Sequence, residues 1–238
     1  MKQSLELGEV LTHLANPQDL DAFLSANAHK CMQQTLNAVF HALNNYPLAD
    51  QLCTVVLDHW NTNKCVGDLT FVFVLCGTNN WVQPADELLK TNAINDAGIL
   101  RAMEIACDRA HTEFLLYMVK KSDEIDQNIH VPALLVRLLK NNPNRKGHNA
   151  LKKMLSSLPI DEPLDEVINQ TLAYSNLLSS KLLFPYIDAN KVAIEYKKKW
   201  YATTETEQWF ETAYAMYQKS LLKKALPKSN PLHAKRKM

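Results

Sequence analysis

The sequence predicts an all-α fold assembled from successive helical hairpins. Apolar residues recur at three- and four-residue steps in most segments, which is the spacing of one face of an α-helix. Only 5 of the 238 residues are glycine and 10 are proline, so the chain lacks the residues for the many tight turns of a sandwich or barrel. Short polar links separate one helical segment from the next. Helix after helix at such spacing indicates a repeat solenoid.

The N-terminal part reads as helices with recognisable start signals. Asn16 supplies a capping amide, and Pro17 follows at the first helical position, where its missing N–H costs nothing. Further on, apolar residues at helical spacing form what we expect to be an antiparallel hairpin. Helices are expected over residues 4–14, 17–24, 30–43 and 47–60.

The segment 69–76, Leu-Thr-Phe-Val-Phe-Val-Leu-Cys, suits two structures. A nearly unbroken run of β-branched and aromatic residues fits either a buried strand or a fully buried helix. Its helical neighbours favour a helix, and the strand stays open as the alternative. A short helix is then expected over residues 84–90, because Pro84 stands near its beginning and acidic residues occupy its first turn.

The most patterned stretch, residues 105–126, reads as two short helices joined by a turn at Ala110-His111, with their apolar residues on facing sides. No linker or change of composition divides the chain. We therefore expect one domain over residues 1–226 and a basic, flexible tail over 227–238. The remaining helices are expected over residues 131–139, 147–155, 164–174, 177–186, 192–200 and 204–226.

The central stretch resembles an ankyrin repeat. Apolar residues stand at the leucine positions of both helices, a small pair allows the helices to approach closely, and Ala110-His111 stands for the Gly-His turn. The glycine of that turn usually has a left-handed backbone, which alanine adopts at a cost of about 1 kcal/mol or more. Thr-Pro-Leu-His is replaced by residues 101–104. The other matching positions are Met103, Ile105, Ala106, Cys107, Phe114, Leu115, Tyr117, Met118, Val119 and the closing Asp126.

A second, partial match covers residues about 131–161. Gly147-His148 takes the place of the Gly-His turn there, with apolar residues behind it. The good match covers residues about 96–126. The resemblance implies ankyrin-like packing over about 79–187, with diverged helical ends, and it implies a non-catalytic scaffold or adaptor that binds another protein.

The resemblance also implies where the partner binds. In ankyrin-like proteins, contacts use exposed residues around the end of the first helix of a pair, while inner apolar positions are occupied with packing. Such proteins in intracellular bacteria and large viruses often act on host proteins, so a host-directed effector is the setting it implies. Neither the partner nor the oligomeric state follows. The expected partner-binding residues are Leu100, Glu104, Asp108, Arg109, Arg137, Lys140 and Asn141.

Tryptophans are the other candidate anchors, because aromatic side chains often carry protein interfaces. The chain has Trp60, Trp81, Trp200 and Trp209. A tryptophan near a helix end more often caps the core.

Charge and cysteine content bear on whether the protein binds nucleic acid or membranes and on the compartment in which it works. Lys+Arg number 26 and Asp+Glu 25, a net charge of +1 that disfavours general affinity for nucleic acid or anionic lipid. No apolar run is long enough to span a bilayer. The five cysteines form no C-x-x-C pair and lie among apolar residues, so we expect reduced, buried thiols. The expected location is the cytoplasm or another reducing compartment, with delivery into a host cell without a cleaved signal peptide as the alternative.

Catalytic motifs are absent from the sequence. The five glycines form no phosphate-binding loop and no nucleophile elbow, and the histidines form no H-E-x-x-H motif. No catalytic residue, cofactor or metal is therefore predicted. Two alternatives stay open: a helical enzyme that gathers its site from distant helices, and a solenoid that binds nucleic acid through residues 197–201, Lys-Lys-Lys-Trp-Tyr.

Overall fold

The computed structural model describes residues 4–91, 94–125, 129–158, 160, 164–173, 177–187 and 204–225, and all the regular structure in them is helical. Their one β-type feature is an isolated bridge between Ser4 and Cys31. The all-α prediction is thus confirmed for these residues. The chain divides into two compact units, unit 1 (Met1–Pro159) and unit 2 (Ile160–Met238), which are described separately. The extent of a single domain, 1–226, stays a prediction.

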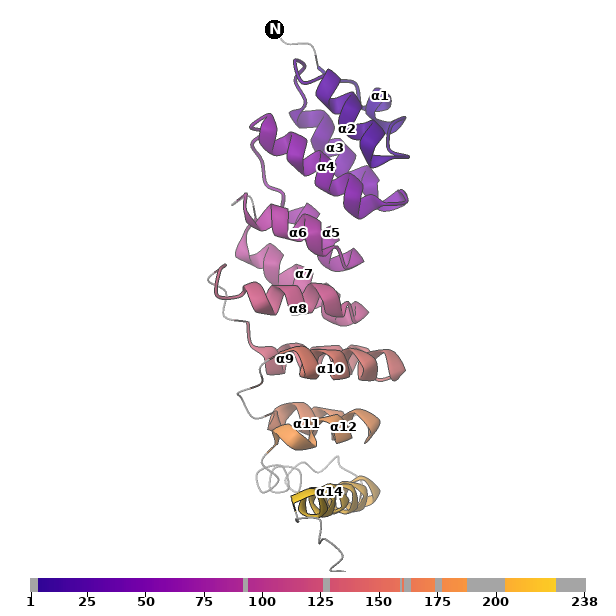
Figure 1. The fold of residues 1–238 in the computed structure, drawn as a ribbon, viewed down its shortest axis with the longest axis vertical. Helices are drawn as coiled ribbons and strands as arrows, with labels where there is room; N and C mark the ends of the chain where they lie inside the picture. The colour runs from indigo at the N-terminus through magenta and orange to yellow at the C-terminus, as the bar shows by residue number, and fades with distance from the viewer. Residues whose placement is uncertain are drawn as a thin grey trace, which may run out of the picture. The chain divides into compact units, whose positions relative to one another are not determined.

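Unit 1 holds ten α-helices in its described residues, and in Figure 1 they follow one another in chain order as hairpins. They are α1 (Leu7–Leu11), α2 (Pro17–Ala26), α3 (Gln33–Ala42) with the 3-10 turn η1 (Leu43–Asn45), α4 (Ala49–Thr62), α5 (Thr70–Asn79), α6 (Val82–Leu89), α7 (Asp96–Arg109), α8 (Thr112–Lys121), α9 (Val131–Asn141) and α10 (Arg145–Ser157).

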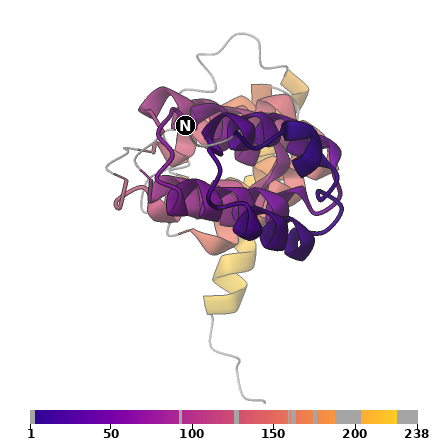
Figure 2. The ribbon, with the colours of Figure 1, turned by 90° about the horizontal axis from the view of Figure 1, so that it is seen from above.

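These helices pack in two rows. Each contacts its hairpin partner, and most also contact the helix two positions further along: α2 with α4, α4 with α6, α6 with α8 and α8 with α10 in one row, and α5 with α7 and α7 with α9 in the other. Figure 2, which views unit 1 from above, shows the two rows side by side. Between α3 and α5 the contact is aromatic, since His41 stacks on Phe71 with ring centroids 4.1 Å apart.

The N-terminal helices confirm one start signal and correct another boundary. Asn16 caps α2 as predicted, its side chain accepting a hydrogen bond of 2.8 Å from the Gln18 N–H. The first helix is shorter than the predicted 4–14, covering only Leu7–Leu11. The reason is that Leu5 N–H donates to the Cys31 carbonyl at 3.2 Å, which holds the chain before α1 in an extended bridge.

Helix α5 settles the segment that the sequence left open. Residues 70–79 are helical, with Val72, Phe73 and Cys76 fully or almost fully buried, so the strand alternative is wrong. Gly77 lies where α5 meets α7. A Cβ built on it would stand 2.4 Å from the Ala102 carbonyl oxygen, so only glycine permits this approach of the two helices.

In the α5–α6 and α7–α8 hairpins, a left-handed residue ends the first helix. Ala110 ends α7 with φ 53° and ψ 47°, and His111 then precedes α8. This is the conformation expected for a residue in place of the Gly-His glycine. Asn80 ends α5 in the same way, with φ 63° and ψ 35°, and Trp81 precedes α6. Asp126, the predicted closing position, lies outside the described residues.

The hairpin of α9 and α10 differs from the predicted second match. Gly147 and His148 lie within α10, not in the turn, which is made by residues 142–144. Asn144 caps α10 by accepting from Lys146 N–H at 2.9 Å. A Cβ on Gly147 would meet the Asn142 carbonyl oxygen at 1.9 Å, so this glycine serves close packing of the turn on the helix.

Unit 2 contains α11 (Asp165–Ala173), α12 (Leu177–Leu183), the 3-10 turn η2 (Phe184–Tyr186) and α14 (Thr204–Ala225). An aromatic cluster holds α14 on η2, since Phe184 lies edge-on to Phe210 with centroids 5.9 Å apart. The predicted helix 192–200 and the tail 227–238 fall outside the described residues. Among the helices that the structure describes, none combines the length and the apolar character needed to cross a bilayer.

Candidate protein-binding surface

The candidate surface is carried by α7 and α9, which pack against each other in unit 1. Arg101, Glu104 and Asp108 follow one another on α7 at three- and four-residue steps, so they share one helical face. Arg137 and Asn141 are four residues apart on α9 and also share a face. Burial of Ala102, Ala106 and Cys107 on the other side of α7 directs the charged face outward. The polar faces of α7 and α9 therefore lie next to each other, which brings the five polar residues together.

We call these five residues, Arg101, Glu104, Asp108, Arg137 and Asn141, the α7–α9 network. Arg137 donates two hydrogen bonds to Asp108, from Nε to Oδ1 at 2.8 Å and from Nη2 to Oδ2 at 3.0 Å. Its Nη1 lies 2.8 Å from Glu104 Oε1. Arg101 Nη1 reaches the other oxygen of Glu104 at 2.9 Å. Asn141 Nδ2 donates to Asp108 Oδ1 at 2.6 Å.

The network is electrically balanced and stiff. Two arginines face two carboxylates, and a forked guanidinium–carboxylate pair fixes direction as well as distance. Hydrogen bonds from Arg137 hold the pKa of Asp108 below its ordinary value, and the amide of Asn141 adds to this. Conversely, Asp108 raises the pKa of Arg137. Asp108 and Arg137 are therefore both charged at neutral pH.

The structure brings four of the seven predicted partner-binding residues into direct contact: Glu104, Asp108, Arg137 and Asn141. Leu100 precedes Glu104 by one helical turn and is 53% exposed. The two remaining residues lie apart from the network. Arg109 donates from Nη1 to the Thr78 carbonyl at 3.1 Å, which directs it toward the end of α5. Lys140 is exposed on α9.

Sequence reasoning missed Arg101 and Asn142. Arg101 occupies a position of the replaced Thr-Pro-Leu-His pattern, and its three-residue spacing to Glu104 was the available signal for an ion pair. Asn142 is buried beneath the surface. Its Nδ2 donates to the Cys107 carbonyl at 2.9 Å and to the Leu138 carbonyl at 3.0 Å, so it joins the ends of α7 and α9. No local sequence signal marks that role.

The cysteines offer no activated nucleophile near this surface. Cys107 lies buried under the network, and burial raises its pKa to about 12. Burial likewise raises the pKa of Cys53 to about 12. Such thiols stay protonated at neutral pH and react slowly. The prediction that all five thiols are buried is wrong for Cys31, which is exposed in the bridge before α3, and for Cys65, which is half-buried.

The tryptophans divide between core and surface. Trp60 is 4% exposed and packs near Phe40, so it belongs to the core, whereas Trp209 is only partly buried. Trp200 and the basic-aromatic segment 197–201 lie outside the described residues.

Metal chemistry has no candidate centre in the part of the chain that the structure describes. Nowhere in it do three His, Cys, Asp or Glu side chains gather in a way that could hold an ion.

No protein-family model, curated protein or solved structure matches this chain.

Proposed function

We propose that this protein is a non-catalytic scaffold that binds another protein, and that its helical hairpins form an ankyrin-like repeat stack. The observation that carries the proposal is the α7–α9 network with its exposed neighbour Leu100. Residues from two successive hairpins form one fixed polar surface with an apolar side chain beside it.

The spacing of hydrogen bonds between hairpins supports the repeat. Many of them join residues about one hairpin apart, from 29 positions for Asp108 with Arg137 to 35 for Cys107 with Asn142. In a repeat stack, each unit contacts only its neighbours, and equivalent positions meet across each junction. Other pairs of this kind are Thr35 with Leu5, Gln33 with Val66, Tyr117 with Asp86, His111 with Gly77 and Phe114 with Asn80.

The turns also support it. Two turns share one design, in which a left-handed residue is followed by the N-cap of the next helix. The residues are Asn80 and Trp81 in one turn and Ala110 and His111 in the other. Their side chains then reach the neighbouring hairpin: Asn80 Oδ1 accepts from Phe114 N–H at 3.0 Å, and His111 Nδ1 lies 3.1 Å from the Gly77 carbonyl. One turn design therefore recurs in consecutive hairpins.

A fixed surface favours binding. The arginines and carboxylates of the network already hold one another, so less side-chain freedom is lost when a partner docks. Leu100 supplies apolar area that water covers in the free protein. The partner that this surface fits has an apolar side chain for Leu100 and hydrogen-bonding groups around it, because the network itself has no net charge.

The test is partner retrieval by the full chain, followed by affinity measurement with each retrieved partner. Leu100→Ser should weaken binding about tenfold or more, while melting stays near that of the parent, since an exposed substitution costs within about 0.5 kcal/mol. Val66→Ser is the matched control, because Val66 is also an exposed apolar residue. Equal affinity of the two variants would contradict the proposal.

The host-directed setting stays a prediction from the resemblance. The identity of a retrieved partner would test it directly: a protein of a host cell supports an effector, and a protein of the same organism argues for an internal adaptor.

A further inference from the structure

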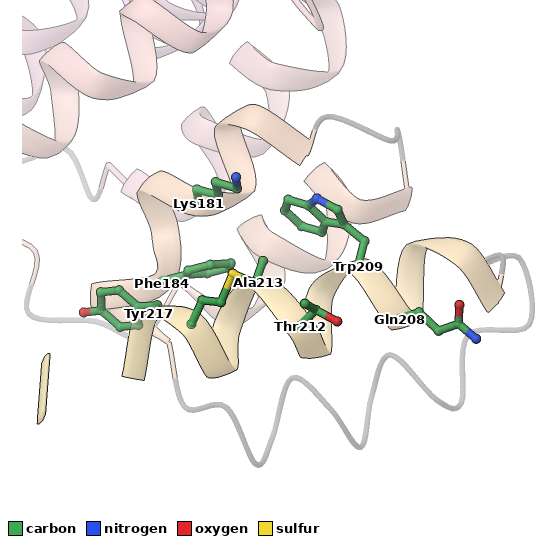
Figure 3. Close-up of a pocket in the computed structure, with 8 residues that line it drawn as sticks. Lys181, Phe184, Gln208, Trp209, Thr212, Ala213 and Tyr217 are labelled. Carbon is green, nitrogen blue, oxygen red and sulfur yellow. The ribbon is translucent and has the colours of Figure 1, made fainter. Parts of the chain in front are cut away.

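Unit 2 has a groove of about 660 Å³ between α12, η2 and α14 (Figure 3). Its floor is Phe184, which is 4% exposed. Trp209, Ala213, Met216 and Tyr217 line it from α14, at positions that recur every three or four residues along the helix. Ligand sites are commonly concave and apolar, with few polar groups, and this groove has that character.

Two exposed apolar side chains lie on the elements that form the groove. Met216 lines it from α14 and is 67% exposed. Leu178 is 59% exposed on α12, one turn before the lining residue Lys181. Large exposed apolar residues gathered in one place mark an interaction site, because water covers them at a cost in the free protein.

Lysines lie beside the groove and further along α14. Lys181 lines the groove from α12, with its Nζ 5.7 Å from the centroid of the Trp209 ring. Lys219, Lys223 and Lys224 follow the last lining residue, Tyr217, along α14 and are exposed. The exposed Glu211 is also on α14 but does not line the groove. Among the described residues no carboxylate forms an ion pair with any of these four lysines. An apolar trough with one lysine beside it and three beyond one end is complementary to an apolar stripe flanked by acidic groups.

We propose that this groove binds an acidic amphipathic helix from a partner protein, with its apolar residues on Phe184, Trp209 and Met216 and its carboxylates on Lys181 and Lys223. A helix laid in a groove contacts it through residues one turn apart, which matches the spacing of the lining along α14. An anionic lipid surface also attracts lysines and exposed apolar side chains. The concave aromatic lining favours a helix, because a bilayer surface does not fill a groove.

This site is separate from the α7–α9 network, so it adds a second interaction surface to the proposed scaffold. If the groove bound no acidic helix, the proposed partner binding at Leu100 would be unaffected. If the Leu100 test failed, the proposed groove would likewise be unaffected.

The experiment uses the full chain and a displayed library of randomised helical peptides. Enriched peptides should carry apolar residues one turn apart, flanked by Asp or Glu. Met216→Glu should weaken their binding about tenfold or more, because it places a carboxylate at the rim that repels the acidic peptide. Met216 is exposed, so this variant should keep the helical spectrum of the parent. Lys120→Glu, on α8 of unit 1, is the matched charge control and should bind like the parent.

Charge reversal gives the sharpest readout. The double variant Lys181→Glu with Lys223→Glu should lose the acidic peptides and enrich peptides in which Lys or Arg takes their place. Three results would overturn the proposal: no enrichment on the parent chain, enriched peptides without acidic residues, or peptide binding that survives Met216→Glu. Capture of the chain by vesicles of phosphatidylcholine and phosphatidylglycerol without any enriched peptide would assign the surface to a membrane instead.

Discussion

Ala110 and Asn80 have the same left-handed backbone conformation, but only the Asn80 side chain makes hydrogen bonds that offset its cost. Asn80 uses its side chain, which accepts from the Phe114 N–H at 3.0 Å and donates to Glu113 Oε2 at 2.7 Å. No hydrogen bond of the Ala110 side chain is possible, so its conformation carries the steric cost of a Cβ without compensation.

We therefore expect glycine to have opposite effects at the two positions. Ala110→Gly should raise the free energy of unfolding by about 0.5–1 kcal/mol, because the strain relieved exceeds the added freedom of the unfolded chain. Asn80→Gly should lower it by about 1–2 kcal/mol through loss of the two hydrogen bonds. Denaturant unfolding of both variants measures the difference. Stabilisation by Asn80→Gly would show that its side chain contributes nothing.

Close packing at Gly77 gives a second contrast. Gly77→Ala should destabilise by about 1–3 kcal/mol, since the new methyl group would push against the Ala102 carbonyl and separate α5 from α7. Gly8→Ala is the control. Nothing lies within 4 Å of a Cβ built on Gly8, so its effect should stay within about 0.5 kcal/mol. Thermal melting of the two variants checks the prediction, and equal melting temperatures would contradict it.

Between helices, Glu113 is the carboxylate that ties three hairpins together. It stands at the start of α8, pairs with Lys153 of α10 and accepts from the Asn80 amide at the turn between α5 and α6. These two contacts lower its pKa to about 2. Because the folded pKa lies below the unfolded one, the ionised carboxylate stabilises the fold above the unfolded value of about 4.3.

That stabilisation should be lost as the pH falls from about 4.3 toward 2. Glu113→Gln should therefore flatten the dependence of unfolding free energy on pH in this window, while the parent loses stability there. Lys153→Met should flatten it in part, because the Asn80 contact remains. Chemical denaturation at a series of acidic pH values measures the effect. If unfolding free energy depended on pH in the same way for the parent and Glu113→Gln, ionisation of this carboxylate would not contribute to stability.

At the scale of the whole molecule, unit 1 has a core of its own. Phe40, Phe73, Phe114 and Leu115 are fully buried within it. A chain of residues 1–159 should therefore fold by itself, with a helical far-ultraviolet spectrum and a cooperative melting transition. Leu115→Asp in the same fragment should abolish that transition, because it places an unpaired charge in the core at a cost of several kcal/mol. A fragment without cooperative melting would favour the single domain over 1–226.

Most helix positions and one of the turns could be predicted from the sequence alone. Periodicity marked the segments around α2, α4, α8 and α14, and Asn16-Pro17 marked the start of α2. The Ala110-His111 turn followed from side-chain pattern alone, since a left-handed residue between two amphipathic helices is a local feature. Local features depend on residues that are close in the chain, and these can be read in order.

The contacts between those helices could not be predicted from the sequence, because they depend on packing between distant segments. An unbroken apolar run fits a buried helix or strand equally, so the form of residues 69–76 depended on its neighbours α6 and α7. Gly147 looked like a turn glycine but lies inside α10, where the Asn142 carbonyl approaches it. The sequence predicted Glu104, Asp108 and Arg137 as exposed partner-binding residues and gave no sign that they contact one another. They form one network because α7 packs against α9. A long charged side chain can pair with any of several nearby groups, and only the packing of the helices decides which one it contacts.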